Sequence, residues 1–276
     1  MRYPLSNGGV VNVFGVTDVG LKRPLNEDSF LVDGKLGLML LADGMGGHDS
    51  GEVASLAAIT TIHTDIQRAI LRYEEEAQQG SGFHEPEDYT LDGFDPPHVN
   101  WLTAAIAQAN DAIFQQNRQR GFAEGLGMGT TLVGCWLMEE GRMTIFHVGD
   151  SRFYLQRRGE PLQRLTQDHS LLREWEVNGG LGERPRRNIL SRSIGPTRGV
   201  QPEITHYPPK DGDILLLTSD GLTSLVADEQ ISMHLRGVSS LGVETVCNQL
   251  VEAANRAGGS DNVTVVVAEV KIPSLR

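Results

Sequence analysis

Carboxylate-bearing motifs recur at the ends of apolar segments along this chain of 276 residues. Hard cations such as Mg2+ and Mn2+ prefer carboxylate, carbonyl and water oxygens, and they relieve the repulsion between carboxylates that lie close together. If the fold gathers the motifs, they form an all-oxygen metal site suited to hydrolysis by activated water. The motifs are Asn26-Glu27-Asp28, Asp43-Gly44-Met45-Gly46-Gly47-His48, Gly149-Asp150-Ser151-Arg152, Ser219-Asp220-Gly221 and Ser260-Asp261-Asn262.

One such motif by itself indicates little, because Asp-Gly and Asp-Asn after a strand are common in turns. The positions of two of these motifs strengthen the case for a functional site. Asp43 ends the apolar run 37–42 and Asp220 ends the run 213–219, so both acids are expected where a buried strand emerges into a loop. Loops at strand ends are where binding and catalytic residues are usually placed.

Taken together, the motifs resemble, in order and spacing, the metal-dependent type 2C (PPM) protein serine/threonine phosphatases in their bacterial form. The resemblance covers nearly the whole chain. It implies an α+β fold, a four-layer α-β-β-α sandwich in which two antiparallel sheets are flanked by antiparallel helix pairs, and one catalytic domain over residues 1–276. The matching segments are 17–28, 42–48, 129–131, 147–152, 165–170, 190–195, 217–222 and 260–264.

The core of the metal site is expected to hold two ions, Mn2+ or Mg2+. Asp43 is the leading candidate to bridge them, because Gly44 lets the backbone approach and offer a carbonyl to the same ion. Asp220 and Asp261 would complete one coordination sphere and Glu27 the other.

Two further acids are given outer roles by the resemblance. Asp28 matches an acid that supports the cluster through water. Asp150 matches a ligand of a third, weaker ion shared with Asp220, although an acid after Gly149 is also typical of a turn.

Arg23 is the candidate for binding phosphate, since a guanidinium stays charged and can engage two phosphate oxygens at once. Out of context it would be interpreted as a surface arginine next to Pro24. The resemblance favours the functional role, because Arg23 lies five positions before Asp28, as in the family.

The general acid for the leaving alkoxide is the least determined role. Eukaryotic relatives carry histidine directly after Asp-Gly, where this chain has Met45. His48 has a suitable intrinsic pKa, and a metal-bound water could do the same work. His147 and His169 favour a structural interpretation, because histidines in strands and caps are usually only hydrogen-bonded.

The segment 171–187 matches the position of the family's mobile flap beside the site. Its arginines could attract a phosphopeptide, or the segment could simply be a basic surface loop. The arginines concerned are Arg184, Arg186 and Arg187.

Hydrophobic periodicity predicts the elements that position these residues. Segments 52–73 and 99–119 are expected as helices joined by a solvated acidic connection over 74–97, and 243–257 as a final helix. Strands at 130–138, 143–148 and 152–156 are expected to form an antiparallel meander, 263–270 a buried central strand, and 1–12 a ragged start. Periodicity alone does not select this sandwich over another α+β arrangement.

Composition agrees with a soluble catalytic domain: 39% of residues are hydrophobic, and no apolar run approaches the roughly 18 residues of a spanning helix. A cytoplasmic location is therefore expected, and Cys135 and Cys247 are interpreted as small core residues. The net charge of −12 argues against nucleic-acid binding and gives an anionic phosphoprotein no long-range attraction.

The resemblance implies a monomeric enzyme that hydrolyses phosphoserine and phosphothreonine in proteins, including Ser/Thr kinases and their targets. Two other functions stay open at this point. One is a phosphoprotein-binding pseudophosphatase, against which the intact acids argue. The other is a regulator of the same fold dedicated to one partner, although such regulators usually carry sensor domains.

Overall fold

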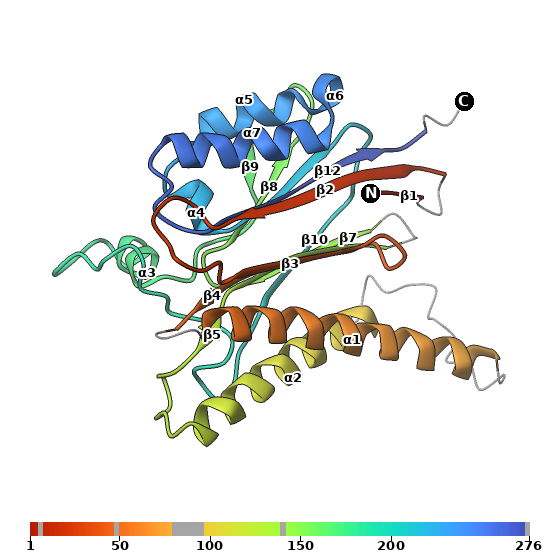
Figure 1. The fold of residues 1–276 in the computed structure, drawn as a ribbon. Coiled ribbons are helices and arrows are strands. Elements are labelled where there is room, and N and C mark those ends of the chain that lie inside the picture. The colour runs from red at the N-terminus through yellow and green to blue at the C-terminus, as the bar shows by residue number, and fades with distance from the viewer. Residues whose placement is uncertain (5–7, 47–49, 79–96, 139–141, 274–276) are drawn as a thin grey trace.

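The computed structural model describes residues 1–4, 8–46, 50–78, 97–138 and 142–273. Two antiparallel sheets lie face to face with helices outside them (Figure 1). The first sheet has the strand order β1 (Arg2–Pro4), β2 (Val10–Asp18), β12 (Val263–Lys271), β11 (Ile214–Thr218), β8 (Arg152–Gln156) and β9 (Gln163–Arg164). The second has the order β10 (Glu203–Tyr207), β7 (Met143–Val148), β6 (Leu132–Leu137), β4 (Leu38–Met45) and β3 (Asp28–Asp33), and β5 (Gly129–Thr130) pairs with β4.

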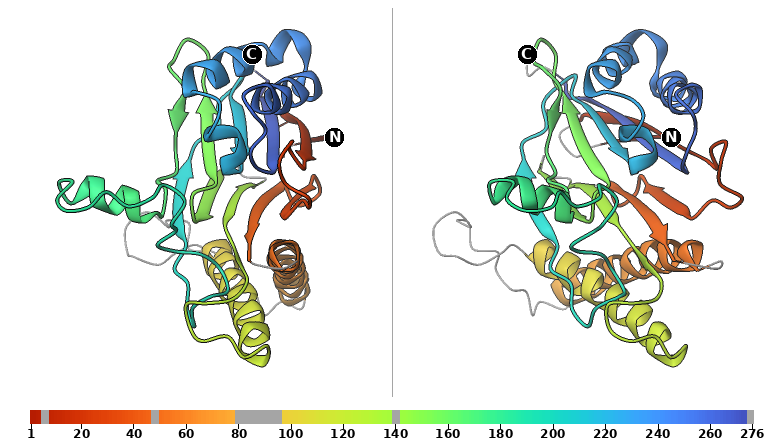
Figure 2. Two further views of the ribbon diagram at one scale, coloured as in Figure 1. Left: turned by 60° about the vertical axis from the view of Figure 1, so that its left-hand side comes forward. Right: turned by 90° about the vertical axis from the view of Figure 1, so that its left-hand side faces the viewer.

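Helices cover the outer face of each sheet (Figures 1 and 2). The long helices α1 (Gly51–Gln78) and α2 (Pro97–Gln119) run in opposite directions under the second sheet. The first sheet is covered by α4 (Asp220–Thr223), α5 (Asp228–Arg236), α6 (Val238–Leu241) and α7 (Val243–Arg256). The predicted four-layer α-β-β-α sandwich is confirmed, and only α3 (Leu171–Val177) projects from it.

Side-chain alternation along the strands fills three cores. In β4, Leu38 and Leu40 pack toward α1 and α2, whereas Met39 and Leu41 point between the sheets. In β12, Val265 and Val267 face the α7 side, whereas Val266 and Ala268 face the other sheet. Successive side chains of a strand point to opposite faces, so strands that are apolar on both faces can tie all four layers together.

The prediction of 263–270 as a buried central strand is confirmed. β12 lies between β2 and β11 and is buried up to Val270. Cys135 in β6 and Cys247 in α7 are buried free thiols, as the sequence predicted. No helix in the described part of the chain is long and apolar enough to cross a membrane.

The predicted three-stranded meander is wrong in its last member. β6 and β7 form an antiparallel hairpin, but β8 joins the other sheet and pairs with β11 and β9. Gly149 allows the crossing, because its φ of 103° lies in the left-handed region that other residues rarely adopt. Short loops indicate neighbouring strands, but they do not show in which sheet the next strand pairs.

Two boundary predictions also need correction. The N-terminus is not ragged throughout, because Arg2–Pro4 pairs in register with residues 10–12 of β2. Helix α1 continues to Gln78, five residues into the expected connection 74–97, since Glu, Ala and Gln are good helix formers. The rest of that connection, from 79 to 96, lies outside the described residues.

A candidate dinuclear metal centre and phosphate site

The acidic motifs meet in a pocket of about 220 Å³ at one end of the two sheets. Both sheets supply residues to it, because β4 belongs to one sheet, and β11 and β12, which belong to the other, end or begin there. Six of the seven predicted metal-site residues line the pocket together with the predicted phosphate ligand Arg23. The six are Glu27, Asp43, Gly44, Asp150, Asp220 and Asp261.

Asp43 is held firmly in the second sheet. Its backbone N–H donates to Thr131 Oγ1 at 3.0 Å, and its carbonyl accepts from Thr131 N at 2.8 Å and Thr130 Oγ1 at 2.9 Å. Burial raises the pKa of this carboxyl well above its ordinary value, and the charges of Asp28 and Asp220 raise it further. The sequence placed Asp43 beyond a strand end, but β4 continues through it to Met45.

Asp28 does not line the pocket but lies behind it. It is the cross-strand partner of Asp43, and its Oδ2 accepts hydrogen bonds from Ser219 Oγ at 2.8 Å and Thr264 Oγ1 at 2.6 Å. Its Oδ1 is buried with no hydrogen-bond partner among the described residues. Burial raises the pKa of Asp28 to about 7 despite these bonds. A buried, unpaired carboxylate oxygen beside a ligand cluster fits an acid that supports a hydrated ion.

Gly44 lies at a close approach of three backbone segments. Its N–H donates to Glu27 O at 3.1 Å, and a Cβ at this position would collide with the carbonyls of Gly51 and Glu27. Glu27 is tied to the start of α1, because its Oε1 accepts from Gly51 N at 3.1 Å. Burial raises the pKa of Glu27. Only glycine fits here, so the Gly44 carbonyl and the Glu27 carboxylate share one edge of the pocket.

Asp220 and Asp261 form the edge supplied by the first sheet. Asp220 is the first residue of α4 and lies two residues after the end of β11, and Asp261 lies two residues before β12. Burial raises the pKa of Asp220, and the charge of Asp261 adds to the effect. Arg23 Nη2 contacts Asp261 Oδ2 at 2.8 Å with 46% of its side chain exposed. Arg23 therefore lies at the mouth of the pocket, where a phosphate oxygen could reach its remaining N–H groups.

Asp150 lies in the crossing between β7 and β8. Burial raises its pKa to about 7, with the charges of Asp220 and Asp168 adding to the shift and Arg152 opposing it. Its position on the pocket wall near Asp220 fits a ligand shared with that residue. The turn interpretation of this motif is correct for the backbone but does not account for a half-buried carboxylate with a raised pKa.

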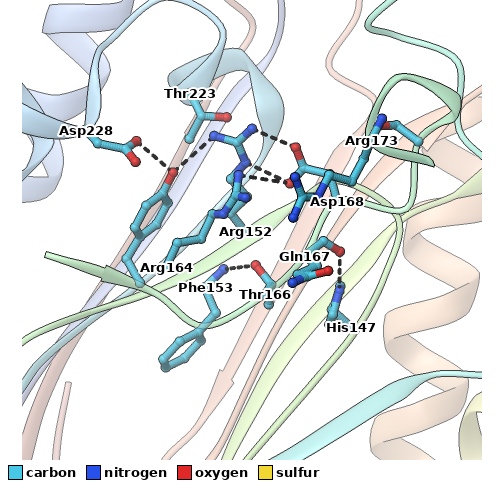
Figure 3. A network of polar contacts seen from close by, with 12 residues as sticks. His147, Arg152, Phe153, Arg164, Thr166, Gln167, Asp168, Arg173, Thr223 and Asp228 are labelled. Carbon is cyan, nitrogen blue, oxygen red and sulfur yellow. Dashed lines mark hydrogen bonds and ion pairs between the residues drawn. The ribbon is translucent and has the colours of Figure 1, made fainter. Parts of the chain in front are cut away.

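A polar network holds the base of β8 next to Asp150 (Figure 3). Arg152 donates to both carboxylate oxygens of Asp168, at 2.9 and 2.7 Å, and to Tyr154 Oη at 3.1 Å. Tyr154 Oη in turn donates to Asp228 at 2.9 Å. Burial alone would raise the pKa of Asp168, but the Arg152 hydrogen bond and charge outweigh it and lower the pKa. The network holds the charged guanidinium of Arg152 near the acidic pocket, where it acts on Asp150 and Asp220.

His147 and His169 lie outside the pocket and form a structural pair. His147 Nε2 donates to Gln167 O at 2.8 Å (Figure 3), and His169 Nδ1 accepts from Gly149 N at 3.2 Å. Burial and the neighbouring His147 lower the pKa of His169 to about 4. With Glu203 they bring three metal-ligand atoms together, but the rings are stacked 4.5 Å apart at 21°. Hydrogen bonds already occupy His147 Nε2 and His169 Nδ1, which supports the structural interpretation. His48 lies outside the described residues.

The segment 171–187 projects beside the pocket as α3 and a following loop (Figure 2). Only one of its three predicted arginines reaches toward the site: Arg187 donates to Thr223 O in α4 at 3.2 Å, and its charge opposes the raised pKa of Asp220. Arg184 and Arg186 are not among the pocket-lining residues. Leu190, which begins the matching segment 190–195, and Asn188, which the sequence did not single out, also line the pocket.

The sequence also gave no role to Asn262, which organises the loop that carries Arg23. Its Nδ2 donates to Val19 O and Leu25 O, both at 2.9 Å, and its Oδ1 accepts from Glu27 N at 2.9 Å. The signal was present, because Asn262 directly follows the predicted ligand Asp261 in a motif that the sequence singled out. Its three partners lie more than 230 residues away in sequence, where no spacing rule could point to them.

A sandwich whose two sheets deliver a buried carboxylate cluster and an arginine to one pocket defines a metal-dependent hydrolase of phosphate esters. Comparison with known proteins specifies the class: the sequence model of the protein phosphatase 2C family matches residues 22–255. The chain belongs to this family and is a metal-dependent protein serine/threonine phosphatase.

Similar proteins come from several bacteria. A putative protein phosphatase 2C-type of Streptococcus pyogenes is 32% identical over 259 residues, which cover 91% of this chain and 94% of that protein. The serine/threonine protein phosphatase PstP of Mycobacterium tuberculosis is 35% identical across 92% of this chain, which spans only 44% of PstP. The solved PstP catalytic domain, in complex with two manganese ions, superposes with a TM-score of 0.71 at 33% identity over 95% of this chain and 99% of that domain.

Proposed function

We propose that the pocket removes phosphate from phosphoserine and phosphothreonine in proteins and so opposes bacterial Ser/Thr kinases. The convergence of six oxygen-donor residues and Arg23 on one pocket carries the proposal. Residues 1–276 are proposed as one catalytic domain that acts as a monomer in the cytoplasm. The buried free cysteines support that compartment, because disulfides are rare there.

The donor set fits Mn2+ or Mg2+. All candidate ligands are oxygens, and five of the carboxyls have pKa values raised by burial: Glu27, Asp28, Asp43, Asp150 and Asp220. Such a cluster is unfavourable when ionised unless cations occupy it. Two divalent ions, when bound, supply an activated water and neutralise phosphate charge.

The residues of the chain have separate tasks in this proposal. Asp43 and the Gly44 carbonyl would bind the ions at the centre of the site. Glu27 would complete the ligands on one side, and Asp220 and Asp261 would complete them on the other. Arg23 orients the phosphate with its planar guanidinium. His48 is retained as the candidate proton donor to the leaving alkoxide.

Chelator-treated protein assayed on a phosphothreonine peptide tests the proposal. We expect no turnover without metal and full recovery with Mn2+ or Mg2+, with inorganic phosphate as the product. If the native protein binds metal and the phosphopeptide but never turns over, the result would indicate the pseudophosphatase alternative. Activity confined to one native phosphoprotein would indicate the dedicated regulator.

A third, weaker ion held by Asp150 and Asp220 is a separate part of the proposal. Asp150→Asn is expected to keep the two tight ions and the fold but to reduce turnover at least about tenfold, even at high Mn2+. Calorimetric titration with Mn2+ and steady-state rates measure the two effects. Native rates across the whole metal range would remove Asp150 from the mechanism, and loss of the tight ions would place it in the central pair.

A further inference from the structure

A second hollow, here called the flank groove, opens directly beside the metal pocket. Its volume is about 580 Å³, and it shares Met45, Asn188 and Leu190 with the metal pocket. A Cβ at Gly129 would collide with both Met45 and Pro196, so these residues pack together where the two hollows adjoin. Because the hollows share lining residues, a peptide whose phosphate enters the metal pocket would bring its neighbouring residues to the flank groove.

The lining of the flank groove has one cation among apolar and uncharged side chains. Met45, Ile189 and Val200 offer apolar surface, with Ile189 37% exposed. Arg192 is exposed and makes no hydrogen bond or ion pair with another described residue, although its charge is felt by the nearby His147 and His169. A guanidinium left free beside apolar surface suits an extended peptide that carries a carboxylate.

We propose that the flank groove holds the part of a phosphoprotein substrate next to its phosphoresidue, with an acidic side chain paired to Arg192. The inference rests on the proposed function of the metal pocket. Arg192 lies four positions after Asn188, which is at the metal pocket, and four positions span at most about 13 Å of chain. The acidic residue is therefore expected within about four positions of the phosphoresidue. Because the net charge of the protein is −12, such a local cation is needed to attract an acidic segment.

Three substrates distinguish this contact from catalysis itself. Two are phosphothreonine peptides that differ only in carrying Glu or Ala at the positions within four residues of phosphothreonine. The third is 4-nitrophenyl phosphate, which has no peptide to occupy the groove. For Arg192→Glu we expect kcat/KM on the Glu peptide to fall about tenfold or more, mainly through KM, with changes within about twofold on the other two substrates.

Arg198→Glu is the matched control, because Arg198 is exposed on the same loop but does not line the groove. It should leave all three rates unchanged. A Lys-substituted peptide should be cleaved better by Arg192→Glu than by the native protein. Equal losses on all three substrates would show that Arg192 has a structural role. Unchanged rates would show that the flank groove does not bind the substrate, and either result would overturn the proposal. Native protein inactive on 4-nitrophenyl phosphate and on both peptides would instead overturn the proposed function.

Discussion

Asp43→Asn, Asp220→Asn and Asp261→Asn should each reduce turnover on a phosphothreonine peptide by about three orders of magnitude or more at saturating Mn2+. Each substitution removes a charged ligand from the ions that activate the nucleophile. Asp43→Asn is expected to have the largest effect, because the charges of four neighbouring acids all act on this carboxyl: Asp28, Asp150, Asp220 and Asp261. Steady-state kinetics together with metal content per chain measure both consequences.

The same substitutions should not unfold the protein. In the absence of metal, removing a charge from a cluster of buried carboxylates relieves repulsion, so the melting temperature of chelated Asp43→Asn is expected to equal or exceed that of the native chain. Asp111→Asn, at an exposed position on α2, serves as the control for a change of one charge. If Asp43→Asn turned over at near-native rates with two bound ions, Asp43 would not be a ligand.

Chelated protein should be more stable at pH 5 than at pH 8, by several degrees in melting temperature. Burial raises the pKa of Asp28 and Asp150 to about 7, above the value near 4 of an unfolded chain. Between these values the folded state binds more protons than the unfolded state, so raising the pH through this window lowers the free energy of unfolding. Thermal unfolding in a chelator across pH 5 to 8 measures the trend.

Saturating Mn2+ should reverse the trend, because binding requires ionised carboxylates and therefore strengthens as the pH rises. Asp150→Asn provides the matched variant: without metal its stability should depend less on pH, since one of the shifted groups is gone. If the chelated native protein became more stable toward pH 8, repulsion among the ionised carboxylates would not destabilise the folded state.

The apolar runs predicted the individual helices and strands well, whereas the four-layer arrangement was predicted only through the resemblance to the phosphatase family. Residues 263–270 could only be a strand buried on both faces, and β12 is one. The departure of β8 from its predicted meander could not be foreseen in the same way. Residues 152–156 have a strand pattern that suits either sheet, and the choice is made by pairing with β11, which lies about 60 residues further along the chain.

The candidate site was predicted as a set of residues more fully than as a geometry. The motifs named the acids, but nothing in their spacing showed that Asp28 lies behind Asp43 while Asp150 reaches the pocket wall. That difference follows from strand register and from the crossing at Gly149, which are tertiary features. The histidines show the converse: the pattern indicated a structural role for His147 and His169, and their hydrogen bonds agree.

Asn262 has a consequence for the energetics of substrate binding. Its side-chain amide fastens both ends of the segment from Val19 to Leu25 and the backbone of Glu27, while its own backbone adjoins Asp261. The guanidinium proposed to bind the phosphate and a carboxylate proposed to bind an ion are thus carried on one cross-linked unit. The conformational entropy of that loop is lost during folding rather than at each encounter with substrate. The site therefore begins every catalytic cycle already preorganised.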